Sequence, residues 1–268
     1  MTLAARAVAC LEAELPSDKV ALTVATARWW RSGGRALGEA GAPARPGRPA
    51  QPVLVPPGAV PRRKITAAAA GRVALLHALA HIELNAIDLA WDVVARFGPA
   101  QPASFADDWV GVALEEALHF SLLAGRLAAL GARYGDLPAH DGLWQAAEAT
   151  ADDLAARLAV VPLVLEARGL DVTPPMIARL EAVGDHESAA ALRRIHRDEI
   201  GHVATGKRWF DRVCAASGRD PRSHWQALVR ARFRGSLKEP FDEPARAKAG
   251  LAADWYRPLA GGSQAGRT

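Results

Sequence analysis

The stretches Glu115-Glu116-Ala117-Leu118-His119-Phe120 and Asp198-Glu199-Ile200-Gly201-His202 decide the fold of this chain. Each contains the pattern Glu-x-x-His, and the second pattern follows the first after 83 positions (199 − 116 = 83). A single glutamate, Glu83 or Glu166, precedes the glutamate of each pattern by 33 positions (116 − 83 = 33; 199 − 166 = 33). This constant spacing indicates two halves that share one architecture.

The residues of this repeat form a ligand set suited to two iron or manganese ions, because carboxylates and imidazoles are donors for these metals. Residues three apart lie on one helical face, so the Glu and His of each pattern can reach the same ion. In dimetal helix bundles, two helices each give one Glu and the other two each give Glu-x-x-His. We therefore expect the metal ligands to be Glu83, Glu116, His119, Glu166, Glu199 and His202.

Apolar residues share the helical faces of these candidates; Leu79 and Ile87, for example, lie one turn before and after Glu83. An isolated ionised carboxylate in such surroundings costs free energy, and several carboxylates on facing helices also repel one another. A pair of cations removes both problems. A single Glu-x-x-His is more often an ordinary helical surface, whereas six residues in the expected order favour metal. Glu166 is the least secure, because Pro162 stands one turn before it.

The composition predicts an all-α protein. Of 268 residues, 50% are apolar but only 6% are aromatic, which suits close-packed helices better than sheets. We see no apolar run approaching the ~20 residues of a membrane helix, and no convincing signal peptide at the N-terminus. We therefore expect a soluble cytoplasmic protein without membrane association.

Cysteine usage and charge narrow the function classes. Cys10 and Cys214 have no CxxC partner, which predicts two reduced thiols instead of a disulfide or zinc site. The net charge of +4 and the pI near 9.4 come from arginines spread along the chain. Only a clustered basic face would argue strongly for nucleic acid, so RNA stays an open substrate class.

Four segments follow from the composition along the chain: a helical extension over 1–40, a proline-rich strap over 41–64, a helical bundle over 65–235 and an irregular tail over 236–268. Seven prolines between Gly41 and Pro61 exclude helix interior and imply an extended strap. We expect this strap to be ordered, with Val53, Leu54, Val55 and Val60 packed on the bundle.

Within the bundle, the apolar period predicts four long helices, and two shorter helices accompany them. Pro162 should kink the third long helix and Gly169 should close it, and Thr173-Pro174-Pro175 should then open a separate short helix. Disorder is expected from Gly261 to Thr268. The long helices are expected at Ile65–Phe97, Trp109–Leu130, Leu143–Arg168 and Glu187–Ala216, and the short ones at Met176–Val183 and Pro221–Arg234.

Five stretches together resemble a known family: His77-Ala-Leu-Ala-His81-Ile-Glu83, Glu115-Glu116-Ala-Leu-His119-Phe120, His140-Asp-Gly-Leu-Trp144, Glu166-Ala-Arg-Gly-Leu-Asp171-Val-Thr-Pro and Asp198-Glu199-Ile-Gly-His202. The family is the bacterial one named domain of unknown function 455, and the resemblance covers about residues 4–251. That family is placed in the ferritin-like superfamily, so the resemblance implies a ferritin-like four-helix bundle with a carboxylate-bridged dimetal centre. It implies no particular reaction.

In that superfamily, the residue before the Glu of Glu-x-x-His is often an acid that hydrogen-bonds a ligand histidine. Glu115 and Asp198 occupy these positions, and solvated acids beside the site are the alternative for both. His81 points away from Glu83 on its helix and is expected at another interface. For His77 and His140 a capping or core hydrogen bond is favoured over a role at the substrate site.

The first functional hypothesis is an O2-dependent oxidase or monooxygenase acting on an organic substrate. Its cofactor would be two metal ions, iron first and manganese as the alternative, and no catalytic side chain is assigned. An external electron donor is expected, because the chain has no flavin or nicotinamide fingerprint. The alternatives are iron handling as a ferroxidase, a tRNA-modifying hydroxylase suggested by a superfamily relative, and a non-enzymatic helical binding module. The assembly is expected to be a monomer or a homodimer.

Overall fold

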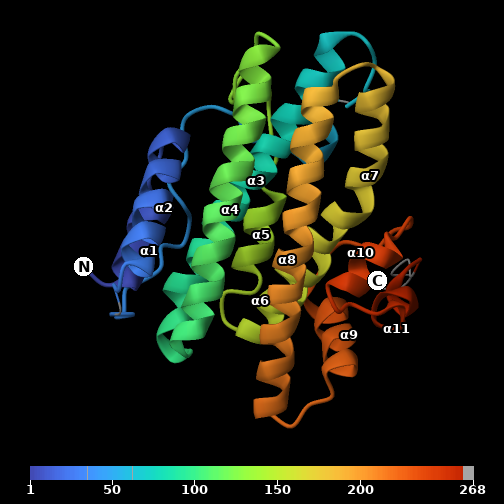
Figure 1. The fold of residues 1–268 in the computed structure, drawn as a ribbon. Helices are drawn as coiled ribbons and strands as arrows, with labels where there is room; N and C mark the ends of the chain where they lie inside the picture. Colours follow the sequence, from blue (N-terminus) through green and yellow to red (C-terminus); the bar gives the residue numbers. More distant parts are fainter. Residues whose placement is uncertain (35, 62, 262–268) are drawn as a thin grey trace. The chain divides into compact units, whose positions relative to one another are not determined.

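The computed structural model describes residues 1–34, 36–61 and 63–261, and these residues are helical, without strands apart from two isolated bridges (Figure 1). The all-α class predicted from composition is therefore confirmed. The α-helices are α1 (Leu3–Glu12), α2 (Pro16–Arg31), α3 (Ala69–Phe97), α4 (Ala103–Ala129), α5 (Gly142–Glu148), α6 (Leu154–Val160), α7 (Ala167–Ala182), α8 (His186–Ala216), α9 (Pro221–Arg232), α10 (Glu243–Lys248) and α11 (Ala253–Tyr256).

The chain forms two compact units. Unit 1 contains Met1–Gln145 and Ala178–Ala191, and unit 2 contains Ala146–Ile177 and Leu192–Thr268. The polypeptide passes between the units within α5, α7 and α8. The segment boundaries proposed from composition differ from this division and stay a prediction.

Unit 1 is built on α3 and α4, which pack against each other, with α1 on α3 and α2 on α4. Their inward faces are apolar, and Leu76, Leu84, Trp109 and Leu123 are almost inaccessible to solvent. α3 ends at Phe97, before Gly98-Pro99, where the sequence predicted its end. The pair of long helices that carries the first half of the repeat is thus present.

α3 is also long and apolar enough to cross a membrane by length and composition, with a mean hydropathy of 1.4 in its most apolar window. The expectation of no unbroken apolar run of ~20 residues is not contradicted, because Glu83, Asp88 and Asp92 interrupt this helix. Moreover, 78% of the apolar window is buried inside the protein. α3 is therefore largely a buried core helix, and the expected solubility and cytoplasmic location stay predictions.

The proline-rich segment lies against unit 1 through polar contacts. Arg48 contacts the buried carboxylate of Asp88, and its Nη2 donates to Asn85 at 2.6 Å. Main-chain bonds add to this, for example from the amide of Val55 to the carbonyl of Ala139 at 2.8 Å. The expected apolar anchoring is wrong for Val53 and Leu54, which are 52% and 41% exposed. Hydrogen bonding, which apolar patterning does not report, holds this segment in place.

In unit 2, the helix expected over Leu143–Arg168 is broken. α5 ends at Glu148, and a new helix, α6, begins after Asp153. The side chain of Asp153 caps α6 by accepting hydrogen bonds from the amides of Ala155 and Ala156. A π-helix, η3 (Val161–Glu166), then begins next to Pro162, where a kink was expected. Asp153 is a good N-cap because its carboxylate satisfies amides that an α-helix leaves unpaired.

The expected helix end at Gly169 and the expected new helix at Thr173-Pro174-Pro175 are both wrong. α7 continues through Gly169, Pro174 and Pro175 without ending. Proline inside a helix removes an amide donor and crowds the preceding turn, which is why the sequence suggested a new helix there. Leu170 and Leu180, on either side of the two prolines, are fully buried. Packing on both sides offsets the local cost.

The C-terminal part of unit 2 is more regular than expected. α9 packs against α6, and Trp225 Nε1 donates to the carbonyl of Ala159 at 3.0 Å. Within the tail expected to be irregular, α10 and α11 form, and Tyr256 is almost fully buried. The aromatic residues of this tail, Trp255 and Tyr256, are buried in the core of unit 2, and this packing orders the backbone of the tail. The disorder expected after Gly261 concerns residues 262–268, outside the described part of the chain.

Candidate metal centre

Unit 1 brings three of the predicted ligands together. Glu83 comes from α3, and Glu116 and His119 come from successive turns of α4. Their exposed fractions are 5%, 0% and 0%, so two carboxylates and an imidazole are enclosed between apolar helix faces. Such burial is costly for charged groups unless an opposite charge accompanies them.

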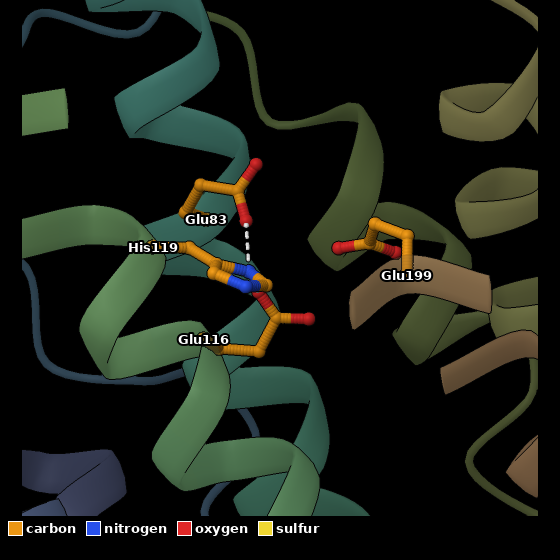
Figure 2. Close-up of side chains that lie close together, drawn as sticks. All are labelled: Glu83, Glu116, His119 and Glu199. Atoms are coloured by element: carbon orange, nitrogen blue, oxygen red, sulfur yellow. Dashed lines mark hydrogen bonds and ion pairs between the residues drawn. The ribbon is translucent and has the colours of Figure 1, made fainter. Parts of the chain in front are cut away.

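The imidazole of His119 lies between the two carboxylates. The Nδ1 atom of His119 is 3.3 Å from Oε2 of Glu83 and 3.3 Å from Oε2 of Glu116 (Figure 2). The three residues each offer a ligand atom, and these atoms lie within 4.8 Å of one another. Side chains from two helices therefore point at one small volume, as metal ligands do.

The charges around His119 act strongly on its protonation. Burial by itself lowers the pKa of His119, but the hydrogen bonds and negative charges of Glu116 and Glu83 outweigh it and raise the pKa to about 11. In the absence of a metal ion, the two carboxylates thus favour the protonated form of the imidazole between them. The two carboxylates require a positive charge at this position, and a divalent metal ion is another way to supply it.

Unit 2 contains the other three predicted ligands. Glu199 and His202 are 8% and 1% exposed, and His202 Nδ1 lies 3.5 Å from Glu199 Oε1 on one face of α8. Glu166 is half-buried and is the last residue of the π-helix η3. π-Helical turns recur at functional sites because they reorient one side chain within a helix. The Glu-x-x-His geometry of the second half is therefore present, and the role of Glu166 stays a prediction.

The donor types present fit a metal ion. Of the buried residues drawn in Figure 2, three lie in unit 1, each offers one ligand atom, and together they could hold such an ion: Glu83, Glu116 and His119. Carboxylates with imidazole suit iron, manganese or zinc, so this set alone does not identify the metal. The complete set of six ligands, with contributions from both units, stays a prediction.

The two acids expected to support the ligand histidines are half-buried. Asp198 accepts a hydrogen bond from Arg194 Nε at 2.5 Å, and Arg197 Nε is 3.7 Å from its other oxygen. Asp198 is therefore paired with arginines next to Glu199. Whether Glu115 and Asp198 orient the histidines stays a prediction.

Three further histidines of unit 1, His77, His81 and His140, have structural partners, as the sequence suggested. His77 Nε2 accepts from the amide of Gly135 at 2.9 Å, and His140 Nδ1 accepts from the amide of Gly142 at 3.2 Å. His81 contacts the hydroxyl of Tyr134 at 2.8 Å through Nδ1. The rings of His77 and His81 therefore fasten the segment after α4 to α3, and the ring of His140 stabilises a turn within that segment.

A buried charge cluster was missed by the sequence reasoning. Lys19 of α2 is 1% exposed and Asp88 of α3 is inaccessible, and they form an ion pair that Arg48 joins. The available signal was the polar series Asn85, Asp88 and Asp92 inside an otherwise apolar helix. Here two cations share one carboxylate, whereas in the group around His119 two carboxylates share one imidazole.

Comparisons with known proteins give a family and no reaction. A family model described as "Protein of unknown function (DUF455)" matches residues 12–257. An uncharacterized protein of Haemophilus influenzae is 41% identical to this chain over 216 residues, which are 77% of this chain and 75% of the relative. No solved structure matches.

Proposed function

The chain belongs to the DUF455 family, whose description assigns no function, and we propose that it is a dimetal-carboxylate protein that oxidises an organic substrate with O2. The proposal includes a ferritin-like four-helix bundle, with two helices from each half of the repeat. The observation that supports it most is the enclosure of Glu83 and Glu116 around His119 in unit 1.

Each half of the repeat would hold one ion. Glu83, Glu116 and His119 would bind the first, and Glu166, Glu199 and His202 would bind the second. The 33-residue spacing within each half and the 83-residue offset between them support this division. Bound iron or manganese ions would supply the redox chemistry with O2 that side chains lack.

The protein residues have their own tasks in this proposal. The carboxylates of Glu83 and Glu116 provide negative charge in a water-poor site, which favours cations at that position. The apolar faces of α3 and α4 exclude water from the ligands, as the burial of Leu84 and Ala113 shows for these helices. Reducing equivalents would come from an external donor.

Metal content of the purified protein tests the first part of the proposal. After loading with Fe(II) and removal of free metal, we expect two ions per chain by elemental analysis. Glu116→Gln and Glu199→Gln should each reduce this number, because an amide is a weaker ligand than a carboxylate. Glu12→Gln makes the same chemical change at an exposed position of α1 and serves as the control.

Oxygen uptake tests the second part. The loaded protein with a reductant such as ascorbate should consume O2 faster than buffer containing the same free iron, and Glu116→Gln should remove the difference. Loaded protein that retains metal but consumes no O2 would contradict an oxidase. A chain that retains no metal after loading would contradict the whole proposal and leave a helical binding module as its replacement.

A further inference from the structure

Unit 2 contains a cavity of about 100 Å³ that the metal site does not use. It lies between the π-helix with the first turn of α7 and the segment that follows α9. Its mouth is polar, because Ser236 and Lys238 are exposed, and its interior carries apolar and aromatic side chains. These interior residues include Val164, Leu165, Phe233 and Phe241.

Arg246 of α10 lines this cavity and is only 2% exposed. Its Nε and Nη2 donate to the two oxygens of Asp171 at 2.8 and 2.7 Å, and Nη2 also reaches the carbonyl of Ala167 at 3.3 Å. Its third nitrogen, Nη1, is buried and has no hydrogen-bond partner among the described residues. A buried donor without a partner is unfavourable, so a ligand that accepts a hydrogen bond from it recovers that free energy.

Two aromatic rings keep the guanidinium group in this orientation. The Cζ atom of Arg246 is 4.4 Å from the ring centroid of Tyr256 and 5.0 Å from that of Phe241. Because Asp171 fixes two nitrogens and the rings cover the plane, Nη1 cannot turn toward another protein acceptor. The donor is therefore preorganised for a ligand.

The charges of the lining select an anion. Arg168, Lys238 and Arg246 contribute three positive charges, and Asp171 contributes one negative charge, which leaves an excess of two positive charges (3 − 1 = 2). Arg168 Nη1 also donates to the carbonyls of Lys238 and Pro240 at 2.6 and 3.1 Å, so the mouth of the cavity is tied to α7. The guanidinium groups of Arg168 and Arg246 thus stand at fixed positions beside apolar walls, and the exposed Lys238 adds the third positive charge.

We propose that this cavity binds the carboxylate or phosphate group of a small organic anion. Arg246 Nη1 donates to the anionic group, Lys238 adds charge at the mouth, and the rings of Phe233 and Phe241 contact the apolar part. The volume is below the ~150 Å³ that accommodates benzene in an engineered cavity, so only the head group and a few carbons are enclosed. The site lies wholly within unit 2 and needs no metal, so it stands apart from the oxidase proposal.

Calorimetric titration of the metal-free protein tests this site. Benzoate and phenyl phosphate serve as the carboxylate and phosphate probes, and benzyl alcohol serves as the neutral one. We expect saturable binding of at least one anion, and its identity distinguishes the two head groups. Lys238→Glu should weaken binding by about tenfold or more, because a repelling charge replaces an attracting one at the mouth. Lys248→Glu, an equal change at an exposed position outside the lining, should leave the affinity unchanged.

Arg246→Lys keeps a positive charge for Asp171 but removes the Nη1 donor, so it should abolish binding of both anions. Equal affinity in Lys238→Glu and the unmodified protein would overturn the proposal. Failure of both anions to saturate at about 10 mM, or equal binding of benzyl alcohol, would do the same. The result with Lys238→Glu decides the question even where Arg246→Lys does not fold.

Discussion

Lys19 and Asp88, 69 positions apart in sequence, form an ion pair that is closed to solvent inside unit 1, with 2.5 Å between Nζ and Oδ1. The ammonium group also donates to the carbonyls of Cys10 and Leu11, at 2.9 and 3.0 Å, near the end of α1. One side chain of α2 therefore joins α1 and α3. Breaking a buried pair leaves an uncompensated charge, whereas replacing both partners with apolar groups is tolerated far better.

Lys19→Met should lower the free energy of unfolding by about 3 kcal/mol, because Asp88 stays buried with Arg48 as its remaining cation. Urea denaturation followed by circular dichroism measures this. Lys64→Met, at an exposed lysine, is the control and should change stability by less than about 0.5 kcal/mol. The double variant Lys19→Met/Asp88→Leu should recover part of the loss, and a single variant as stable as the unmodified protein would contradict the role of the pair.

Gly206 of α8 has no room for a side chain. A Cβ atom there would lie 2.4 Å from Cβ and Cγ of Pro162, the residue near the start of the π-helix. We expect Gly206→Ala to lower the unfolding free energy by about 1–3 kcal/mol through overpacking.

Gly201→Ala is the matched control, since it lies on the same helix with no atom within 4 Å of an added Cβ. It should raise stability by about 0.5–1 kcal/mol, because alanine favours helix. Thermal denaturation of both variants measures whether Gly206→Ala lowers the melting temperature while Gly201→Ala raises it. Equal shifts in one direction would show that helix propensity, and not contact with Pro162, sets the effect.

His81 should make stability depend on pH. Burial first, then the positive charge of Arg48, lowers its pKa to about 4, and the carbonyl of His140 opposes this by accepting a hydrogen bond. His77 and His140 face it as further titratable groups. The folded protein thus keeps His81 neutral, while the unfolded chain takes up a proton below about pH 6.5.

The stability that neutral His81 contributes is therefore fully present above pH 6.5 and is lost as the pH falls toward 4, by up to about 3 kcal/mol. Urea denaturation between these pH values measures the slope, and His81→Gln should reduce it. His186→Gln, at an exposed histidine, should leave the slope as in the unmodified protein. A slope unaffected by His81→Gln would assign the pH dependence to other groups.

Metal addition should stabilise the protein through Glu83, Glu116 and His119. A ligand present at about 100 times its dissociation constant adds about 2.7 kcal/mol to the unfolding free energy. We therefore expect Fe(II) or Mn(II) to raise the melting temperature and a chelator to reverse the rise. Glu116→Gln should lose most of the rise and Glu12→Gln none, whereas an equal rise in both would place the metal elsewhere.

Much of the candidate site was readable in the linear chain because helical periodicity is local. Glu116 and His119, three apart, must share a face of any helix that contains them. Apolar spacing around Glu83 also indicated that its face is buried, and both expectations agree with unit 1. The two free thiols, Cys10 and Cys214, are likewise buried without a disulfide, as their positions suggested.

The sequence by itself determined the all-α class, the long helices α3 and α4 and the convergence of Glu83 with the first Glu-x-x-His. Only the tertiary structure decided the Lys19–Asp88 pair, the π-helix at Pro162, the passage of α7 through Pro174-Pro175 and the orientation of Arg246. The physical reason is range: periodicity and capping act within a few residues, so a sequence displays them directly. Burial of a lysine or a tolerated proline depends on partners tens of positions away, which become neighbours only when the helices pack.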